Sequence, residues 1–330
     1  MTIPVKTIIS ASLITLIGTV LLWKTDVRPG LLSPGALQPT KVEGSMFPIT
    51  LIDAVGESIQ LTEPPQRIVS ATLATDEILA DLVDPARIVG VTFLANNKTI
   101  SNVSDRYPAW IKRIRGEVEE IMALQPDLVF ISPYTRAETV RLLLGSDIPV
   151  VRLSELNTLA DIESSIKLVA AATGSHSKAL ELLNPIYEQQ AKLKLQLSGL
   201  DMPRVLFYNL NGSTVGPGST IDEIIHLAGG YNAVRDTGIR GSQNISEELA
   251  ISLQPDVILV SGWDDPNGKT PAQILAQRGS WQNVPAVLQK RIYNLNGGWL
   301  FATSQFTWDG IEQVAGILHP QLKQAKELEQ

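Results

Sequence analysis

The stretch VEEIMALQPDLVFIS, residues 118–132, has a counterpart later in the chain, ISEELAISLQPDVILVS, residues 245–261. In both, a segment with helical periodicity precedes the tetrapeptide LQPD, and an aliphatic run follows it. Proline ends the helix, aspartate favours a turn, and the runs at residues 128–131 and 257–260 are typical of strands buried on both faces. A tetrapeptide alone can recur by chance. The shared order of helix, turn and strand instead indicates one supersecondary unit used twice.

Residues 157–200 separate the two halves and predict a helical strut. Thr158 is the expected N-cap, and Gly174 ends the first part of the strut. The second part begins near Ser177, where Pro185 predicts a kink unless it opens a new first turn. A plain core helix of a single domain would show the same periodicity, and the repeat favours the connecting role.

Strands and helices alternate on both sides of the strut, which predicts an α/β fold with two similar, mainly parallel sheets. The expected strands are residues 67–70, 88–91, 128–131 and 150–153 in a first lobe (47–156), and 205–208, 232–234, 257–260 and 292–295 in a second lobe (201–330). Before the first of them, residues 49–62 alternate around Val55-Gly56 and predict a hairpin.

Composition limits the classes of function. The 330 residues are 44% apolar, which suits about two packed domains, and the formal charge of −7 argues against a nucleic-acid partner. The chain contains no cysteine. Disulfides, thiolate metal sites, a cysteine nucleophile and lipoprotein acylation are therefore excluded.

An uncharged run at residues 7–23, flanked by Lys6 and Lys24, predicts export to the periplasm. Its length suits either a removed signal peptide (1–24) or an uncleaved anchor in the inner membrane. Residues 25–46 are rich in Pro, Gly and Ser without periodicity and predict a flexible linker.

Candidate ligand-binding residues follow the expected strands, because ligands of open α/β sheets bind at the carboxyl ends of the strands. Aromatic side chains recur there in both halves, and asparagine and arginine accompany them. The predicted ligand-binding residues are Phe93, Tyr134, Asn209, Asn211, Arg240, Trp263 and Trp299. Any one aromatic could instead merely cover a strand end.

Motifs for catalysis or nucleotide binding are absent: there is no Walker loop, G-x-S-x-G, H-E-x-x-H or G-x-G-x-x-G. The glycine-rich run VGPGSTIDE at residues 215–223 could bind an anion, but Ser219 and Asp222 favour an ordinary helix cap. The three histidines, at 176, 226 and 319, are isolated in sequence. We expect no metal site and no cofactor.

The ordered segments FPITLIDAVGESIQL, PPQRIVSATLATDEILADLVDPARIVGVT, EVEEIMALQPDLVFIS, TIDEIIHLAGGYNAV and LQPDVILVSG resemble the solute-binding proteins of ABC importers for ferric siderophores, haem and cobalamin. The resemblance covers residues 47–318. It implies the class III, chelatase-like fold, with two lobes on a backbone helix. It also implies a receptor that binds a metal chelate between its lobes, performs no chemistry on it and delivers it to an ABC permease.

Members of this family dock to the permease through one acidic residue on each lobe. The resemblance assigns this role to Glu77 in ATDEILADL. In TIDEIIHLAGG the matching position is His226, and Glu223 precedes it by one turn. Either Glu223 substitutes for the missing acid, or the second contact is weaker and depends on pH.

The leading hypothesis is a periplasmic receptor for an iron chelate, most simply a ferric siderophore, with cobalamin or haem as alternatives. A second hypothesis keeps the fold but assigns an accessory or sensory binding module without transport. A third is an enzyme on the same scaffold. The absence of cysteine and of clustered histidine disfavours that third hypothesis.

Overall fold

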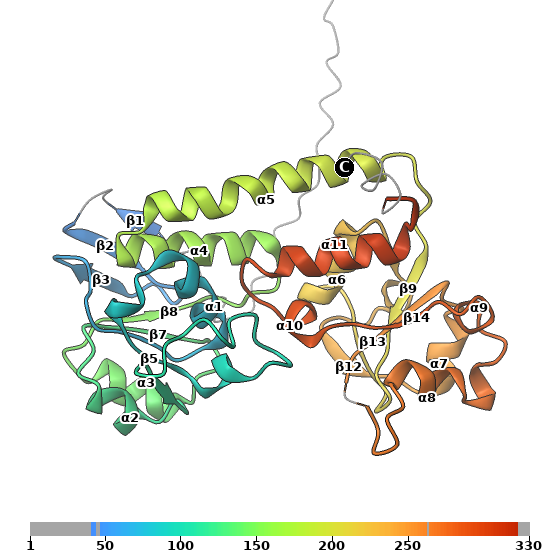
Figure 1. Cartoon of the computed structure of the whole chain (residues 1–330), viewed down its shortest axis with the longest axis horizontal. Helices are drawn as coiled ribbons and strands as arrows, with labels where there is room; N and C mark the ends of the chain where they lie inside the picture. The colour runs from blue at the N-terminus through green and yellow to red at the C-terminus, as the bar shows by residue number, and fades with distance from the viewer. Residues whose placement is uncertain (1–40, 44–46, 263, 323–330) are drawn as a thin grey trace, which may run out of the picture. The chain divides into compact units, whose positions relative to one another are not determined.

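Two parallel sheets form the framework of the computed structural model, which describes residues 41–43, 47–262 and 264–322 (Figure 1). The first sheet has the order β6-β5-β4-β7-β8, with β4 Ile68–Ser70, β5 Ile88–Thr92, β6 Lys112–Ile114, β7 Leu128–Ile131 and β8 Val150–Arg152. The second has the order β11-β9-β13-β14, with β9 Arg204–Phe207, β11 Tyr231–Asn232, β13 Val257–Val260 and β14 Ile292–Asn294. The order β5-β4-β7-β8 thus matches β11-β9-β13-β14, and the predicted α/β fold of two similar lobes is confirmed.

Helices pack on both faces of each sheet because successive strand residues point to opposite sides. In β7, Leu128 and Phe130 face one core while Val129 and Ile131 face another, and β13 divides in the same way. The first lobe carries α1 Leu73–Leu82, α2 Val118–Ala123 and α3 Ala137–Leu144, with 3₁₀ turns Pro85–Arg87 and Phe93–Asn96. The second carries α6 Thr220–Leu227, α7 Glu247–Ser252, α8 Pro271–Ala276, α9 Pro285–Leu288, α10 Gly297–Leu300 and α11 Thr307–Leu318, with 3₁₀ turns Ala233–Thr237 and Gly279–Trp281.

The repeated LQPD units have the same structure in both lobes. Asp127 accepts a hydrogen bond from the Arg67 backbone amide (2.8 Å), and Asp256 accepts one from that of Arg204 (2.9 Å). The arginine side chains donate to the carbonyls of Leu124 and Leu253 in turn. The glutamine of each unit has a backbone in the left-handed region, with φ of 47° at Gln125 and 46° at Gln254. Each unit therefore joins the start of a lobe's central strand to the end of a helix, which explains its recurrence.

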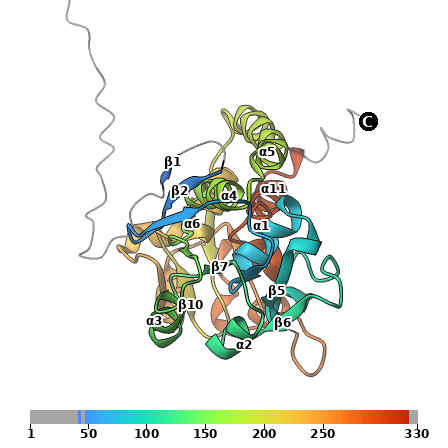
Figure 2. The same cartoon turned by 90° about the vertical axis from the view of Figure 1, so that its left-hand side faces the viewer.

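The predicted strut is two helices lying side by side, α4 Leu159–Thr173 and α5 His176–Leu197 (Figures 1 and 2). Thr158 caps α4 in a capping box with Asp161, and Gly174 ends it at φ 71°, as expected. Helix α4 belongs to the core of the first lobe. Helix α5 continues through Pro185 and buries Leu183 in the first core and Leu193 in the second. Helix α5 therefore has buried residues in both cores, and Leu159 at the start of α4 packs, partly buried, against both as well.

The predicted hairpin is confirmed: β2 Ile49–Ile52 pairs with β3 Ser58–Leu61, and β1 Lys41–Glu43 pairs with β2. Asp53 closes the turn by accepting from the amides of Val55 and Glu57. A further two-stranded sheet was not expected from the sequence. It pairs β10 Ser213–Val215 with β12 Ser242–Asn244, next to the candidate residues Asn211 and Arg240.

The predicted signal segment, 1–24, and nearly all of the predicted linker, 25–46, lie outside the described residues. Within the part of the chain that the structure describes, no helix combines the length and apolarity that a membrane crossing requires.

Candidate ligand-binding cleft

A cavity of about 720 Å³ lies at the strand ends of the second lobe, against a loop of the first lobe. The first lobe contributes Lys98, Thr99 and Ile100. The second contributes Asn209, Leu210, Asn211, Ser261, Gly262, Pro271, Leu295, Asn296, Gly297 and Phe301. This is where ligands of parallel α/β sheets are expected.

The lining combines neutral polar groups with apolar surface and one cation. The Asn209 side-chain oxygen Oδ1 accepts from the backbone amide (3.0 Å) and the hydroxyl (3.1 Å) of Ser261, which holds neighbouring strand ends together. Phe301 is 51% exposed beside them, and Lys98 is exposed at the rim, 3.5 Å from Asp105. Such a surface suits a bulky polar ligand without requiring a charge-matched partner.

The two lobes approach closely beside the cavity. A Cβ on Gly297 would lie 2.9 Å from the Thr99 carbonyl oxygen, so only glycine fits there without displacing the loop. The Asn102 side-chain amide donates to the Gly298 carbonyl at 2.8 Å. A Cβ on Gly298 would in turn lie 3.0 Å from Asn102 Oδ1, so the close approach of the lobes favours glycine at both positions after β14.

The structure brings only some of the predicted ligand-binding residues together. Asn209 and Asn211 line the cavity. Phe93, at the end of β5, and Tyr134, in the loop after β7, are 51% and 77% exposed and do not line it. Arg240 is exposed before β12, and Trp263 lies outside the described residues.

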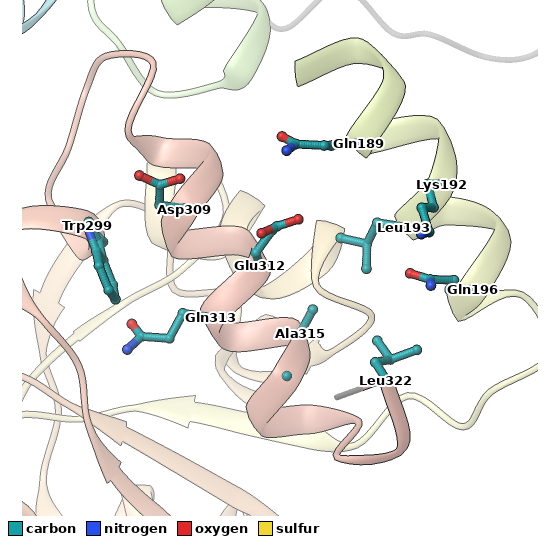
Figure 3. Close-up of a pocket in the computed structure, with 11 residues that line it drawn as sticks. Gln189, Lys192, Leu193, Gln196, Trp299, Asp309, Glu312, Gln313, Ala315 and Leu322 are labelled. Carbon is teal, nitrogen blue, oxygen red and sulfur yellow. The ribbon is translucent and has the colours of Figure 1, made fainter. Parts of the chain in front are cut away.

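Trp299 points elsewhere, because α10 starts at Gly297 and turns the side chain toward α11. It lines a second cavity, of about 620 Å³, between α5 and α11 (Figure 3). Figure 3 shows Trp299 on the same side as Asp309 and Gln313 of α11, opposite Gln189 of α5. The expectation that one pocket gathers the aromatics of both halves is therefore not met for Trp299.

Sequence reasoning missed Lys98, Ile100 and Phe301. The loop 97–102 has no periodicity that would assign it a place in the fold. Phe301 follows the strand-end segment by a single turn of α10, so its contribution depends on that short helix. For Phe301, its closeness in sequence to the strand-end residue Gly297 was the signal that could have indicated a place at the cavity.

The three predicted docking residues lie in different environments. Glu77, in α1, is 1% exposed. Its Oε1 accepts from the Asn102 backbone amide (2.9 Å) and side-chain amide (2.8 Å), and its Oε2 accepts from the Ser304 hydroxyl (2.5 Å). Burial raises the pKa of Glu77 above its usual range. An ion pair with a permease arginine would first require the Ser304 contact to break.

Glu223, not His226, is the counterpart of Glu77. Both follow a buried aspartate that ties its helix to a neighbouring strand: Asp76 accepts from Thr92 at the end of β5, and Asp222 accepts from Asn232 in β11. Because β5 and β11 hold the same place in their sheets, the DEI sequences of α1 and α6 correspond.

Glu223 is half-buried, and His226 is exposed on the same helix. The Glu223 Oε2 accepts from the Leu159 backbone amide at 3.0 Å, and burial raises the pKa of this carboxyl. Glu223 and His226 both line a groove of about 990 Å³ alongside α5.

Among residues 41–43, 47–262 and 264–322, no group of three or more His, Cys, Asp or Glu side chains could hold a metal ion.

Comparison with known proteins agrees with the fold. A model of the periplasmic binding protein family matches residues 68–297. A Bacillus subtilis (strain 168) protein described as an uncharacterized ABC transporter substrate-binding lipoprotein is 22% identical over 85% of this chain and 88% of its own length. A cobalamin-binding protein of Halobacterium salinarum (strain ATCC 29341 / DSM 671 / R1) is 26% identical over 76% of this chain and 68% of its own.

Among solved structures, the molybdate-binding protein MolA of Haemophilus influenzae, bound to molybdate, has a TM-score of 0.67 at 22% identity. The match covers 84% of this chain and 93% of MolA. These relatives are substrate-binding transport proteins, not enzymes. The chain belongs to the periplasmic binding protein family, the substrate-binding components of ABC importers.

Proposed function

We propose that this protein captures an organic metal chelate in the cavity between residues 98–100 and the strand ends of the second lobe, and delivers it to an ABC permease. The observation that carries the proposal is the lining of that cavity. Amides, a hydroxyl and Phe301 offer contact area and orientation. The ligand's own donor atoms would hold the metal, since the described part of the chain offers no cluster of metal ligands.

A ferric siderophore is the first candidate. The volume of about 720 Å³ lies in the range of small-molecule sites, and catecholates and hydroxamates present oxygen acceptors that Asn211 and Lys98 can meet.

Cobalamin is the second candidate, and one observation favours it: a cobalamin-binding protein is 26% identical over 76% of this chain. The corrin side chains carry amides, which pair with asparagine amides. The flat face of the macrocycle suits Phe301.

Titration of the full chain with ferric catecholate, ferric hydroxamate, haem and cobalamin tests both candidates. Saturable quenching of tryptophan fluorescence by one of them is expected. Phe301→Ala should weaken that binding about tenfold, because it removes roughly 1–2 kcal/mol of aromatic contact.

Leu288→Ala is the matched control, because Leu288 is exposed on α9 and does not line the cavity. No saturable binding of any of the four ligands, or equal loss in both variants, would contradict the proposal.

We also propose that residues 7–23 tether the protein to the inner membrane.

A third proposal is that α6 takes part in docking to the permease through the exposed His226. His226→Ala is expected to reduce co-purification with the cognate permease several-fold, since it removes an exposed polar contact without disturbing Glu223. His176→Ala, at the exposed start of α5, is the control. Equal recovery of permease with both variants would argue against docking through α6.

A further inference from the structure

We infer that Glu77 and Glu223 are a symmetric pair of interlobe clasps, which set how the two lobes face each other across the cavity. This inference rests on the fold and is independent of which chelate binds.

The first clasp joins α1 to the segment that leads into α11. The Ser304 hydroxyl of the second lobe donates to Glu77 Oε2 at 2.5 Å. The Gln305 side-chain amide donates to the Glu77 backbone carbonyl (2.8 Å) and to Asp81 Oδ2 (2.6 Å). The same Asn102 amide group that donates to Glu77 also donates to Gly298. One carboxylate therefore organises contacts from both lobes.

The second clasp joins α6 to the first lobe. Glu223 Oε2 accepts from the backbone amide of Leu159, the first residue of α4, whose core is in the first lobe. The Thr220 hydroxyl, in the first turn of the same helix, donates to the Leu156 carbonyl at 2.8 Å. A carboxylate at a helix start is also favoured by the helix dipole.

The two clasps are related by the internal repeat. Each glutamate follows a buried aspartate on the helix that packs beside its lobe's central strands, and each reaches toward the opposite lobe. Hydrogen bonds to carboxylates are stronger than those between neutral groups. Losing both clasps should therefore shift the population of lobe arrangements by about tenfold or more.

The position of the first clasp connects it to the ligand. Asn102 follows the loop 98–100 that lines the cavity, and Gly298 follows Gly297, which lines it from the other side. Loosening Glu77 should therefore widen the cavity on both walls at once. These glutamates act as positioning residues, because neither lines the cavity.

The absence of cysteine allows the test to be made with paired spin labels. Labels at Leu142→Cys on α3 and Leu288→Cys on α9, both exposed, report the interlobe distance in the ligand-free full chain. Glu77→Ala with Glu223→Ala is expected to lengthen the mean distance and broaden its distribution. Glu138→Ala with Glu248→Ala, two exposed first-turn acids, should leave the distribution unchanged.

Two further variants decide the matter if the double alanine variant fails to fold, because they keep both glutamates and remove only their donors. Ser304→Ala removes the Oε2 donor of Glu77. Leu159→Pro removes the amide that serves Glu223, at a first helical position where proline is tolerated, and Leu159→Ala controls for the lost side chain.

Broader distributions for Ser304→Ala, and for Leu159→Pro relative to Leu159→Ala, support the clasps. The clasps are overturned if the distance distribution of Ser304→Ala equals that of the unsubstituted protein and the distribution of Leu159→Pro equals that of Leu159→Ala. Failure of chelate titration alone leaves this distance measurement interpretable, so the two proposals fail separately.

Discussion

Asp76→Asn should flatten the dependence of stability on pH between about 4 and 7. Asp76 is fully buried in α1, and burial raises its pKa from 3.8 to about 7, although Thr92 donates to it through both amide and hydroxyl. The folded state therefore holds a proton that the unfolded state has released. The free energy of unfolding is therefore not reduced by Asp76 below about pH 4. It falls as the pH rises from 4 to 7, and the loss from this group alone reaches about 4 kcal/mol.

The measurement is the free energy of unfolding in urea at several pH values for the wild type and for Asp76→Asn. Other carboxyls with raised pKa, such as Glu77, add a dependence of the same sign, so the difference between the two proteins isolates Asp76. Asp105→Asn, an exposed acid, is the control. Parallel profiles for wild type and Asp76→Asn would show that Asp76 titrates normally.

Gly216→Ala should cost about 3 kcal/mol of stability. A Cβ at this position would lie 2.3 Å from the Ile239 carbonyl oxygen and 2.9 Å from its carbonyl carbon. Both atoms are backbone, and the Gly216 amide is held by the Gly241 carbonyl at 2.8 Å, so relief requires the β10–β12 pair to separate. The same pair positions Asn211, so chelate affinity should fall as well.

Chemical denaturation of Gly216→Ala tests this expectation, with Gly279→Ala as the matched control because a Cβ there meets no atom within 4 Å. The control should stay within about 0.5 kcal/mol of the wild type. If Gly216→Ala unfolds at the same denaturant concentration as Gly279→Ala, the close approach to Ile239 is not maintained in solution.

The architecture could be predicted because its signals are local and repeated. Buried aliphatic runs, the Pro-Asp turns of LQPD and the cap at Thr158 each follow from a few neighbouring residues. The cap at Ser219, favoured over an anion-binding loop, is confirmed by its bond to the Asp222 amide. Helix α4 was less predictable, since its periodicity suits a core helix and a connector equally.

The environments of the candidate site residues could not be predicted, because they depend on contacts between residues far apart in the sequence. Glu77 looks like a surface acid in sequence, because Ser304, its partner across the lobes, lies 227 positions away. The resemblance places His226 at the position that matches Glu77, whereas the strand partners of Asp76 and Asp222 identify Glu223. The direction of Trp299 depends on where α10 begins. Strands β10 and β12 have three residues each, too few for an alternating pattern to stand out in the sequence.

Hydrogen–deuterium exchange tests the binding site most directly. It is measured with and without whichever of the four ligands binds saturably in the fluorescence titration. We predict slower exchange at residues 97–102, 209–213 and 295–301, the two walls of the 720 Å³ cavity. Protection confined to residues 189–196 and 309–316, around the Trp299 cavity, would place the ligand elsewhere and contradict this account.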